Sequence, residues 1–385
     1  MEIIYERYLW NKMAKSSENF LRNSTELVIP GGTNESKAYR LEANALGKHV
    51  IGASCIQNDP DKSFYDKWIY IPSIHDAGFE ENLLQNISRE HITSIFCPHI
   101  VLYKVISKIL EAHNLSVSFV NPPPGEIETI KVTSLYESAT KVRDLAVALN
   151  TDYCQEIPDL AEIAGLLFYT RMIPGMTSEE KLAAFLAIYP ELPKGDIVEI
   201  GAYRGRSTYM LSWGSRRYQI GKVLVLDPWS PILAQQNNSP DIVRDEDQTL
   251  IKDLASFWET TFEGFLAALS PFRGVMNYLR LPSVEAVKIY TRKQKIQSPT
   301  FGTTKYTGQI SLIHIDGNHD YEMVNEDCNS WLPFIMPGGW IVFDDYLWLH
   351  GDGPQKVGDD FLQNNSNKIE RAFCFDKSLF IKMKI

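Results

Sequence analysis

The chain has 385 residues, 44% of them hydrophobic, and carries a formal net charge of -10. A single hydrophobic core rarely serves a chain of this length, so two domains are expected. The negative charge disfavours partners held by bulk electrostatic attraction, so we expect neither a nucleic-acid nor a membrane partner. A small-molecule acceptor fits this charge better.

Cysteine usage and the N-terminal stretch bear on the compartment. Five scattered cysteines form no Cys-x-x-Cys pair, which argues against a disulfide framework and against a thiolate metal site. Residues 1–23 lack the apolar core of a signal peptide, and no run reaches transmembrane length. We therefore expect a cytoplasmic protein.

The first part of the chain alternates apolar runs with helical patterns, which predicts a small parallel α/β domain. A strand is expected from Glu26, followed by a helix that ends at Leu46. The further strands are expected at 49–54, 68–72, 92–97 and 116–120, and the helices between them at 79–88 and 99–113.

A stiff Asn-Pro-Pro-Pro-Gly segment at 121–125 breaks this pattern. The next helical pattern covers 131–150 and is expected to bridge two domains, with a boundary near Leu149. We therefore divide the chain into domains 1–150 and 151–385. Two more helices are expected at 160–172 and 179–189.

The stretch from Gly195 to Thr208 has the pattern of a strand, a tight glycine loop and a helix start. Gly201 and Gly205 allow the backbone to approach a ligand, and a helix start offers free N–H donors. The spacing differs from the dinucleotide pattern Gly-x-Gly-x-x-Gly, so a pyrophosphate is not the first candidate ligand. Asp227 ends the next apolar run, where a carboxylate can accept both hydroxyls of a ribose. A nucleoside without a pyrophosphate is thus indicated.

These residues resemble motif I of the class I S-adenosylmethionine-dependent methyltransferases, and Gly-Ala-Tyr-x-Gly-x-Ser is similar to the form found in catechol O-methyltransferase. The resemblance runs from about Ile173 to the C-terminus. It implies a Rossmann-like seven-stranded domain of the α/β class. It also implies a cofactor site made of Glu199, Gly201, Tyr203, Gly205, Ser207, Asp227, Ser283 and Met176. Ser283 belongs to a turn that borders the adenine, and Met176 to a loop that covers the cofactor.

The order of the elements in the first part of the chain, together with segments 45–53 and 67–72, resembles the small domain that precedes the ATP-binding part of ATP-grasp ligases, although that part is missing here. An assembly surface or a substrate platform is the expected use of this domain, and we expect a homo-oligomer. The polar stretch 230–247 is expected to be a mobile flap near the cofactor, with disorder of no function as the alternative.

Carboxylates follow two further predicted strands. Asp316 comes directly after strand 310–315, and Asp344 and Asp345 follow strand 340–343. Neighbouring parallel strands lie about 4.8 Å apart, so these three acids are expected to converge beside the cofactor. Without a cation they would repel one another and hold protons, whereas Mg²⁺ or another divalent ion would make them oxygen ligands.

The same acidic pattern resembles the metal-dependent O-methyltransferases, including those that methylate sugar hydroxyls of natural products. In this resemblance His319 occupies the position of the catalytic base, while relatives that act on sugars carry an acid where this chain has Asn318. Asp316 and His319 are therefore the candidate catalytic residues, with a substrate-orienting His319 as the alternative. His314 is expected to be a packed core residue.

The sequence thus predicts an Mg²⁺-dependent O-methyltransferase. It would move a methyl group from S-adenosylmethionine to a hydroxyl of a diol-bearing sugar or phenolic natural-product intermediate. Two alternatives stay open at this point: a hydroxylase of an antibiotic pathway on the same fold, and an inactive cofactor-binding partner subunit.

Overall fold

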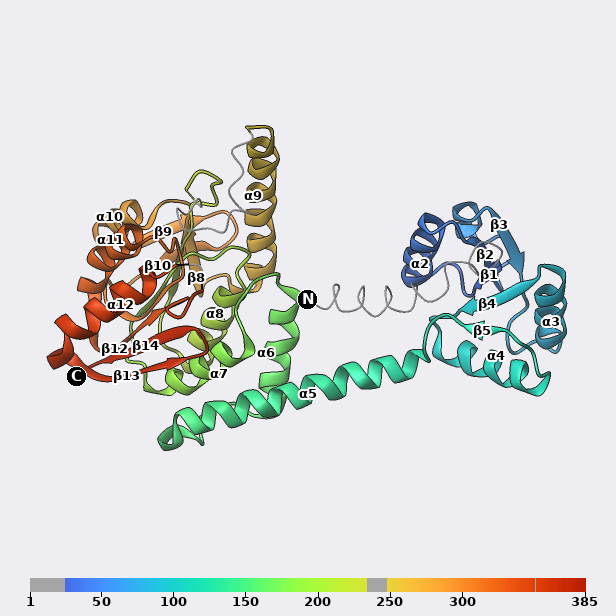
Figure 1. Ribbon diagram of the computed structural model, residues 1–385, viewed down its shortest axis with the longest axis horizontal. Coiled ribbons are helices and arrows are strands. Elements are labelled where there is room, and N and C mark those ends of the chain that lie inside the picture. The colour runs from blue at the N-terminus through green and yellow to red at the C-terminus, as the bar shows by residue number, and fades with distance from the viewer. Residues whose placement is uncertain (1–24, 234–247, 350) are drawn as a thin grey trace. The chain divides into compact units, whose positions relative to one another are not determined.

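The computed structural model describes residues 25–233, 248–349 and 351–385 (Figure 1). By its internal contacts the chain divides into two compact units, residues 1–134 and 135–385. None of the described helices is both long and apolar enough to cross a membrane.

The first unit contains a parallel sheet whose described strands have the order β3-β2-β1-β4-β5. Strands and helices alternate along the chain, because each parallel neighbour needs a crossover connection. The elements are β1 (Thr25–Val28), α2 (Asn34–Ala45), β2 (His49–Ser54), β3 (Lys67–Tyr70), α3 (Phe79–Arg89), β4 (Ile92–Phe96), α4 (Ile100–Ala112) and β5 (Ser118–Phe119). The predicted strands and helices of this region are found within a few residues of their expected bounds.

One long helix, α5 (Pro124–Leu149), begins inside the proline segment 121–125, earlier than the predicted start at residue 131, and belongs to both units. The division falls between Ser134 and Leu135, inside the helix, whereas the sequence places the boundary after its last turn. The reason is packing: Ala139, Val142 and Ala146 are buried in the hydrophobic core of the second unit. The second half of α5 is therefore part of the second unit.

The second unit is built on a seven-stranded sheet, counted over the described residues, with the order β13-β14-β12-β11-β6-β7-β8. Strands β6, β7, β8, β11 and β12 are parallel, and β14 runs antiparallel to both β12 and β13. The bounds are β6 (Asp196–Ile200), β7 (Val223–Leu226), β8 (Met276–Leu279), β11 (Ile310–Ile315), β12 (Ile335–Phe343), β13 (Ile369–Phe375) and β14 (Ser378–Met383). This is the predicted Rossmann-like seven-stranded domain, and the α/β fold class is confirmed.

Helices cover both faces of this sheet, so its central strands are buried on both sides and consist mainly of apolar residues. Ile197 and Val225 face a core formed with α6, α7, α8 and α9, whereas Val198 and Leu224 face a second core formed with α10, α11 and α12. The bounds are α6 (Leu160–Met172), α7 (Glu179–Ile188), α8 (Arg206–Tyr218), α9 (Gln248–Leu269), α10 (Ser283–Lys293), α11 (Tyr321–Trp331) and α12 (Gly353–Asn364).

Two features of this unit depart from the sequence pattern or lie beyond it. A hairpin of β9 (Lys295–Ser298) and β10 (Gly302–Lys305) was not predicted. The predicted flap at 230–247 falls mostly on residues 234–247, which lie outside the described residues.

Candidate functional site

The glycine loop lies between β6 and α8, and its geometry explains both glycines. Gly201 and Gly205 have positive φ angles of 83° and 88°. A Cβ on Gly201 would lie 2.0 Å from the carbonyl oxygen of Asp316, and one on Gly205 would lie 2.4 Å from the Leu269 side chain. Backbone conformation and close packing therefore require glycine at both positions. The contact with Asp316 also brings the glycine loop against the end of β11.

Asp227, at the end of β7, fixes the shape of the same loop. Its Oδ2 accepts the backbone N–H groups of Ala202 at 2.9 Å and Tyr203 at 3.0 Å, and its Oδ1 accepts that of Trp229 at 2.7 Å. Burial raises the pKa of Asp227, and these backbone hydrogen bonds oppose the rise. The structure thus gives Asp227 a task that the sequence did not reveal, whereas the predicted ribose contact stays a prediction.

Glu199, in β6, is fully buried and lies inside the protein network. Its carboxylate accepts a hydrogen bond from the Thr208 hydroxyl, and Oε1 lies 3.2 Å from Nδ1 of His314. His314 is the partner of Glu199 in the register of β11 and β6. The visible role of Glu199 is therefore to link the glycine loop and α8 to β11, and its contact with a cofactor stays a prediction.

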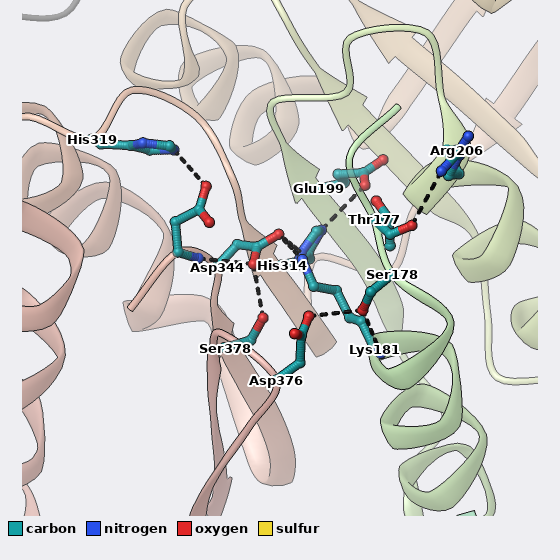
Figure 2. A network of polar contacts seen from close by, with 11 residues as sticks. Thr177, Ser178, Lys181, Glu199, Arg206, His314, His319, Asp344, Asp376 and Ser378 are labelled. Atoms are coloured by element: carbon teal, nitrogen blue, oxygen red, sulfur yellow. Dashed lines mark hydrogen bonds and ion pairs between the residues drawn. The ribbon is translucent and has the colours of Figure 1, made fainter. Parts of the chain in front are cut away.

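His314 continues this network to the acidic cluster (Figure 2). Its Nε2 lies 3.4 Å from Oδ2 of Asp344, and the same oxygen forms an ion pair with Lys181. The Ser378 hydroxyl and the backbone N–H of Asp345 donate to the other oxygen of Asp344, each at 2.8 Å. His314 is thus a buried charge partner and not the simple packed residue that the sequence suggested.

The charges in this network shift its pKa values in opposite directions. Burial alone would raise the pKa of Asp344, but Lys181 and His314 lower it well below its usual value. Burial and the charge of Asp344 raise the pKa of both Asp316 and Asp345. Burial alone would lower the pKa of His314, but Asp344 and Glu199 raise it to about 9. Without a cation, two of the three acids therefore have raised pKa values, the direction expected for carboxylates that repel one another, whereas the pKa of Asp344 is lowered.

The three predicted acids and His319 do converge at the ends of β11 and β12. Ligand atoms of Asp316, His319 and Asp345 lie within 4.8 Å of one another, and so do those of His314, Asp316 and Asp344. Nε2 of His319 lies 3.4 Å from Oδ2 of Asp345, and its ring packs edge-on against Trp348. Burial lowers the pKa of His319, so its neutral form dominates near neutral pH. A neutral imidazole can accept a proton or bind a metal ion.

The other predicted cofactor residues are spread around the glycine loop. Ser207 is buried in the first turn of α8, and the Ser283 hydroxyl, at the start of α10, donates to the buried carboxylate of Asp327. Tyr203 lies in the loop with a positive φ, and its carbonyl accepts the Trp229 indole N–H at 2.7 Å. These positions are compatible with the predicted site but do not test it.

Met176 lies in the loop between α6 and α7 and is 91% exposed. The side chain of Met176 is therefore not packed in a hydrophobic core. Arg206, at the start of α8, donates from Nε to the carbonyl oxygen of Ile173 at 2.7 Å. The loop that was expected to cover the cofactor is thus attached to the end of the glycine loop.

Lys181 is the residue of this network that sequence reasoning missed. It lies in α7 and is followed by seven residues, Leu182 to Ile188, that are all buried. A helix with such an uninterrupted apolar run has little exposed surface, so a lysine at its start is a candidate for burial beside an acid. That signal was present in the sequence, but the identity of its partner was not.

Comparison with known proteins supports a methyltransferase. Residues 198–346 match a protein family described as a methyltransferase domain. A segment of 37 residues is 46% identical to the uncharacterized protein R132 of Acanthamoeba polyphaga mimivirus; it covers 10% of this chain and 17% of that relative.

Solved structures that are similar to part of this chain include named O-methyltransferases. The O-methyltransferase NovP is 15% identical with a TM-score of 0.36, over 64% of this chain and all of that chain. The calicheamicin methyltransferase CalS11 is 14% identical with a TM-score of 0.35, over 64% of this chain and 91% of that one. The mycinamycin-pathway methyltransferase MycE, solved with Mg, S-adenosylhomocysteine and mycinamycin VI, is 14% identical with a TM-score of 0.35. The match covers 59% of this chain and 55% of MycE. At these values the likenesses carry no conclusion about substrate or metal.

The family match covers the glycine loop, Asp227 and the acidic cluster, and it falls on the seven-stranded sheet. The second unit is therefore a class I methyltransferase domain, and the family resemblance predicted from motif I is confirmed.

Proposed function

We propose that this protein transfers a methyl group from S-adenosylmethionine to a hydroxyl oxygen of a small diol-bearing acceptor, with the help of a divalent cation such as Mg²⁺. The observation that carries the proposal is the convergence of Asp316, Asp344, Asp345 and His319 after the C-terminal ends of β11 and β12. The glycine loop follows β6 at the same end of the sheet. The packing of Gly201 against the Asp316 backbone makes the two parts neighbours.

The cofactor part of the proposal rests on the family match and on the loop itself. Gly205 directly precedes α8, whose first turn presents backbone N–H groups toward the loop. Asp227 holds the backbone of Ala202 and Tyr203 in place, so the loop is preorganised before any ligand binds. These features suit the amino-acid and nucleoside parts of S-adenosylmethionine.

The residues present also fit a divalent cation. Asp316 and Asp345 are partly exposed acids whose pKa values are raised by burial and by Asp344. Their carboxylate oxygens, with Asp344 as a third acid, form the hard donor set that Mg²⁺ prefers. A bound ion would neutralise this charge and hold the two oxygens of a diol, which lowers the pKa of the hydroxyl that attacks.

The chain itself supplies the remaining functions. His319, neutral near pH 7, accepts the hydroxyl proton, and Trp348 and Asp345 hold its ring in place. The loop 173–177, attached through Arg206, lies beside the start of α8 and presents the exposed Met176. Positioning of the two reactants and neutralisation of charge account for most of the rate in such a site.

The acceptor is proposed by its chemistry. A site that holds one divalent ion favours a molecule with two adjacent oxygens, such as a sugar or a catechol-like phenol. A sugar or a phenolic natural-product intermediate is therefore the proposed acceptor class.

Two substitutions test the roles of the acid and the histidine. Asp316→Asn should reduce turnover steeply and leave S-adenosylmethionine binding nearly unchanged, because its side chain belongs to the acidic cluster and not to the glycine loop. His319→Ala should lower turnover by roughly 10²–10⁴-fold, the usual contribution of a general base.

The pH profile separates the two possible uses of His319. A base acts in its neutral form, and burial lowers the pKa of His319, so the acid limb of the wild-type profile should fall below the usual histidine pKa. The variant should lose this limb and recover partly at high pH as the acceptor ionises unaided. An unaltered profile combined with a weaker metal affinity would instead make His319 a metal ligand.

A further inference from the structure

Lys181 is buried at a place where a lysine is costly. The residue is 5% exposed, and its ammonium group contacts Asp344, which is 4% exposed. An ammonium removed from water loses several kcal/mol of hydration, so burial is tolerated only when the charge is paired. The following residues of α7 are all buried as well.

The surroundings of Lys181 are strongly acidic. Asp344 pairs with it directly, and Asp316 and Asp345 interact with it electrostatically. Glu199, which is fully buried, adds a fourth carboxylate through His314. Among the lysines and arginines of the described residues, Lys181 is the one that forms an ion pair with an acid of this cluster.

A divalent ion and Lys181 therefore compete for the same negative charge. Lys181 already contacts Oδ2 of Asp344, and Asp344 is grouped with His314 and Asp316 as a candidate set of metal ligands. Two positive centres that share one carboxylate repel each other, and in a partly buried site this repulsion is much larger than in water.

We propose that Lys181 is a fixed counter-cation of the metal site, which holds Asp344 in place in the metal-free protein and weakens the binding of the divalent ion. This inference rests on the metal part of the proposed function. Its consequence is an ion that exchanges readily, in a site that stays folded without it. Lys181 is thus a positioning residue and not a catalytic one.

A second ion pair in the same unit provides a matched control. Lys382, in β14, has a side chain that is 14% exposed and forms ion pairs with Glu191 at 2.7 Å and with Glu370 at 2.9 Å. These partners belong to none of the candidate metal groups. Lys382→Met should therefore lower stability without changing metal affinity.

The test is calorimetric titration of MgCl₂ into the full chain, for the wild type, Lys181→Met, Lys181→Arg and Lys382→Met. Lys181→Met should bind Mg²⁺ at least tenfold more tightly than the wild type, because a positive charge has been removed from beside the ion. Lys181→Arg keeps the charge and Lys382→Met lies elsewhere, so both should match the wild type. In EDTA, Lys181→Met should be much less stable to thermal unfolding than the wild type. Added Mg²⁺ should restore more stability to this variant than to any other.

Lys181→Gln serves if the methionine variant does not fold, since it keeps a hydrogen-bond donor beside Asp344 without the charge. Lys181→Gln should also bind Mg²⁺ more tightly than the wild type. If the wild type binds Mg²⁺ and neither uncharged variant binds it more tightly, the inference is overturned while the proposed metal site stands. If no variant binds a divalent ion, both fail together.

Discussion

At the scale of single residues, the carboxylates near strand ends accept hydrogen bonds from the protein itself. Asp227 accepts three backbone N–H groups and so determines the conformation of the glycine loop. Glu199 binds Thr208 and contacts His314, and Asp344 is held by Lys181 and Ser378. The site is therefore preorganised by hydrogen bonds to its own acids.

Asp227→Ala should weaken S-adenosylhomocysteine binding by on the order of 1.5–3 kcal/mol, because buried N–H groups lose a charged acceptor and the loop relaxes. Calorimetry measures this directly. Asp196→Ala is the matched control: Asp196 starts β6, at the end of that strand opposite to the glycine loop, and its carboxylate also accepts two backbone N–H groups, from Thr307 and Gly308. Asp196→Ala should lower the stability of the protein without changing its affinity for S-adenosylhomocysteine. Equal affinity in the Asp227 variant and the wild type would remove this residue from the cofactor site.

The sequence revealed the positions of these acids but not their partners. Strand periodicity predicts that Asp227, Asp316 and Asp344 follow buried strands, and parallel pairing predicts that the last two meet. Partners such as Lys181 and Ser378 come from distant parts of the chain, and nothing in their local sequence selects Asp344. Tertiary pairing of this kind is invisible to pattern reasoning.

At the scale of elements, strands with apolar runs were predictable and polar ones were not. The central strand β11 (Ile310–Ile315) is found at its predicted bounds because every residue in it is buried. The hairpin β9 and β10 has the polar sequences Lys-Ile-Gln-Ser and Gly-Thr-Thr-Lys, which give little hydrophobic signal. The division inside α5 was missed for a similar reason, since helical periodicity does not say which core a helix joins.

The position of that division can be tested with two fragments of the second unit. The fragment 135–385 should fold and bind S-adenosylhomocysteine like the full chain. The fragment 151–385 lacks Ala139, Val142 and Ala146, which are buried in its core, and should lose on the order of 3–5 kcal/mol of unfolding free energy. Urea denaturation measures both. Equal stability of the two fragments would restore the boundary near residue 150.

At the scale of the whole molecule, the two units differ in how much supports a function for each. The methyltransferase domain combines a family match, a glycine loop and an acidic cluster in one unit. The first unit is a parallel α/β domain, as predicted, and its similarity to the domain that precedes the ATP-binding part of ligases stays a prediction. So do the cytoplasmic location, the homo-oligomer and the absence of nucleic-acid partners.

The central claim is metal-dependent transfer of a methyl group to an oxygen. The most direct test incubates the full chain with S-adenosylmethionine and a panel of catechols, sugars and nucleotide sugars, and follows S-adenosylhomocysteine and acceptor mass by mass spectrometry. We expect one acceptor class to gain a single methyl group, with turnover abolished by EDTA and restored by Mg²⁺. Undiminished turnover in EDTA would contradict the role of the metal. An acceptor that gains oxygen without formation of S-adenosylhomocysteine would contradict methyl transfer and indicate a hydroxylase.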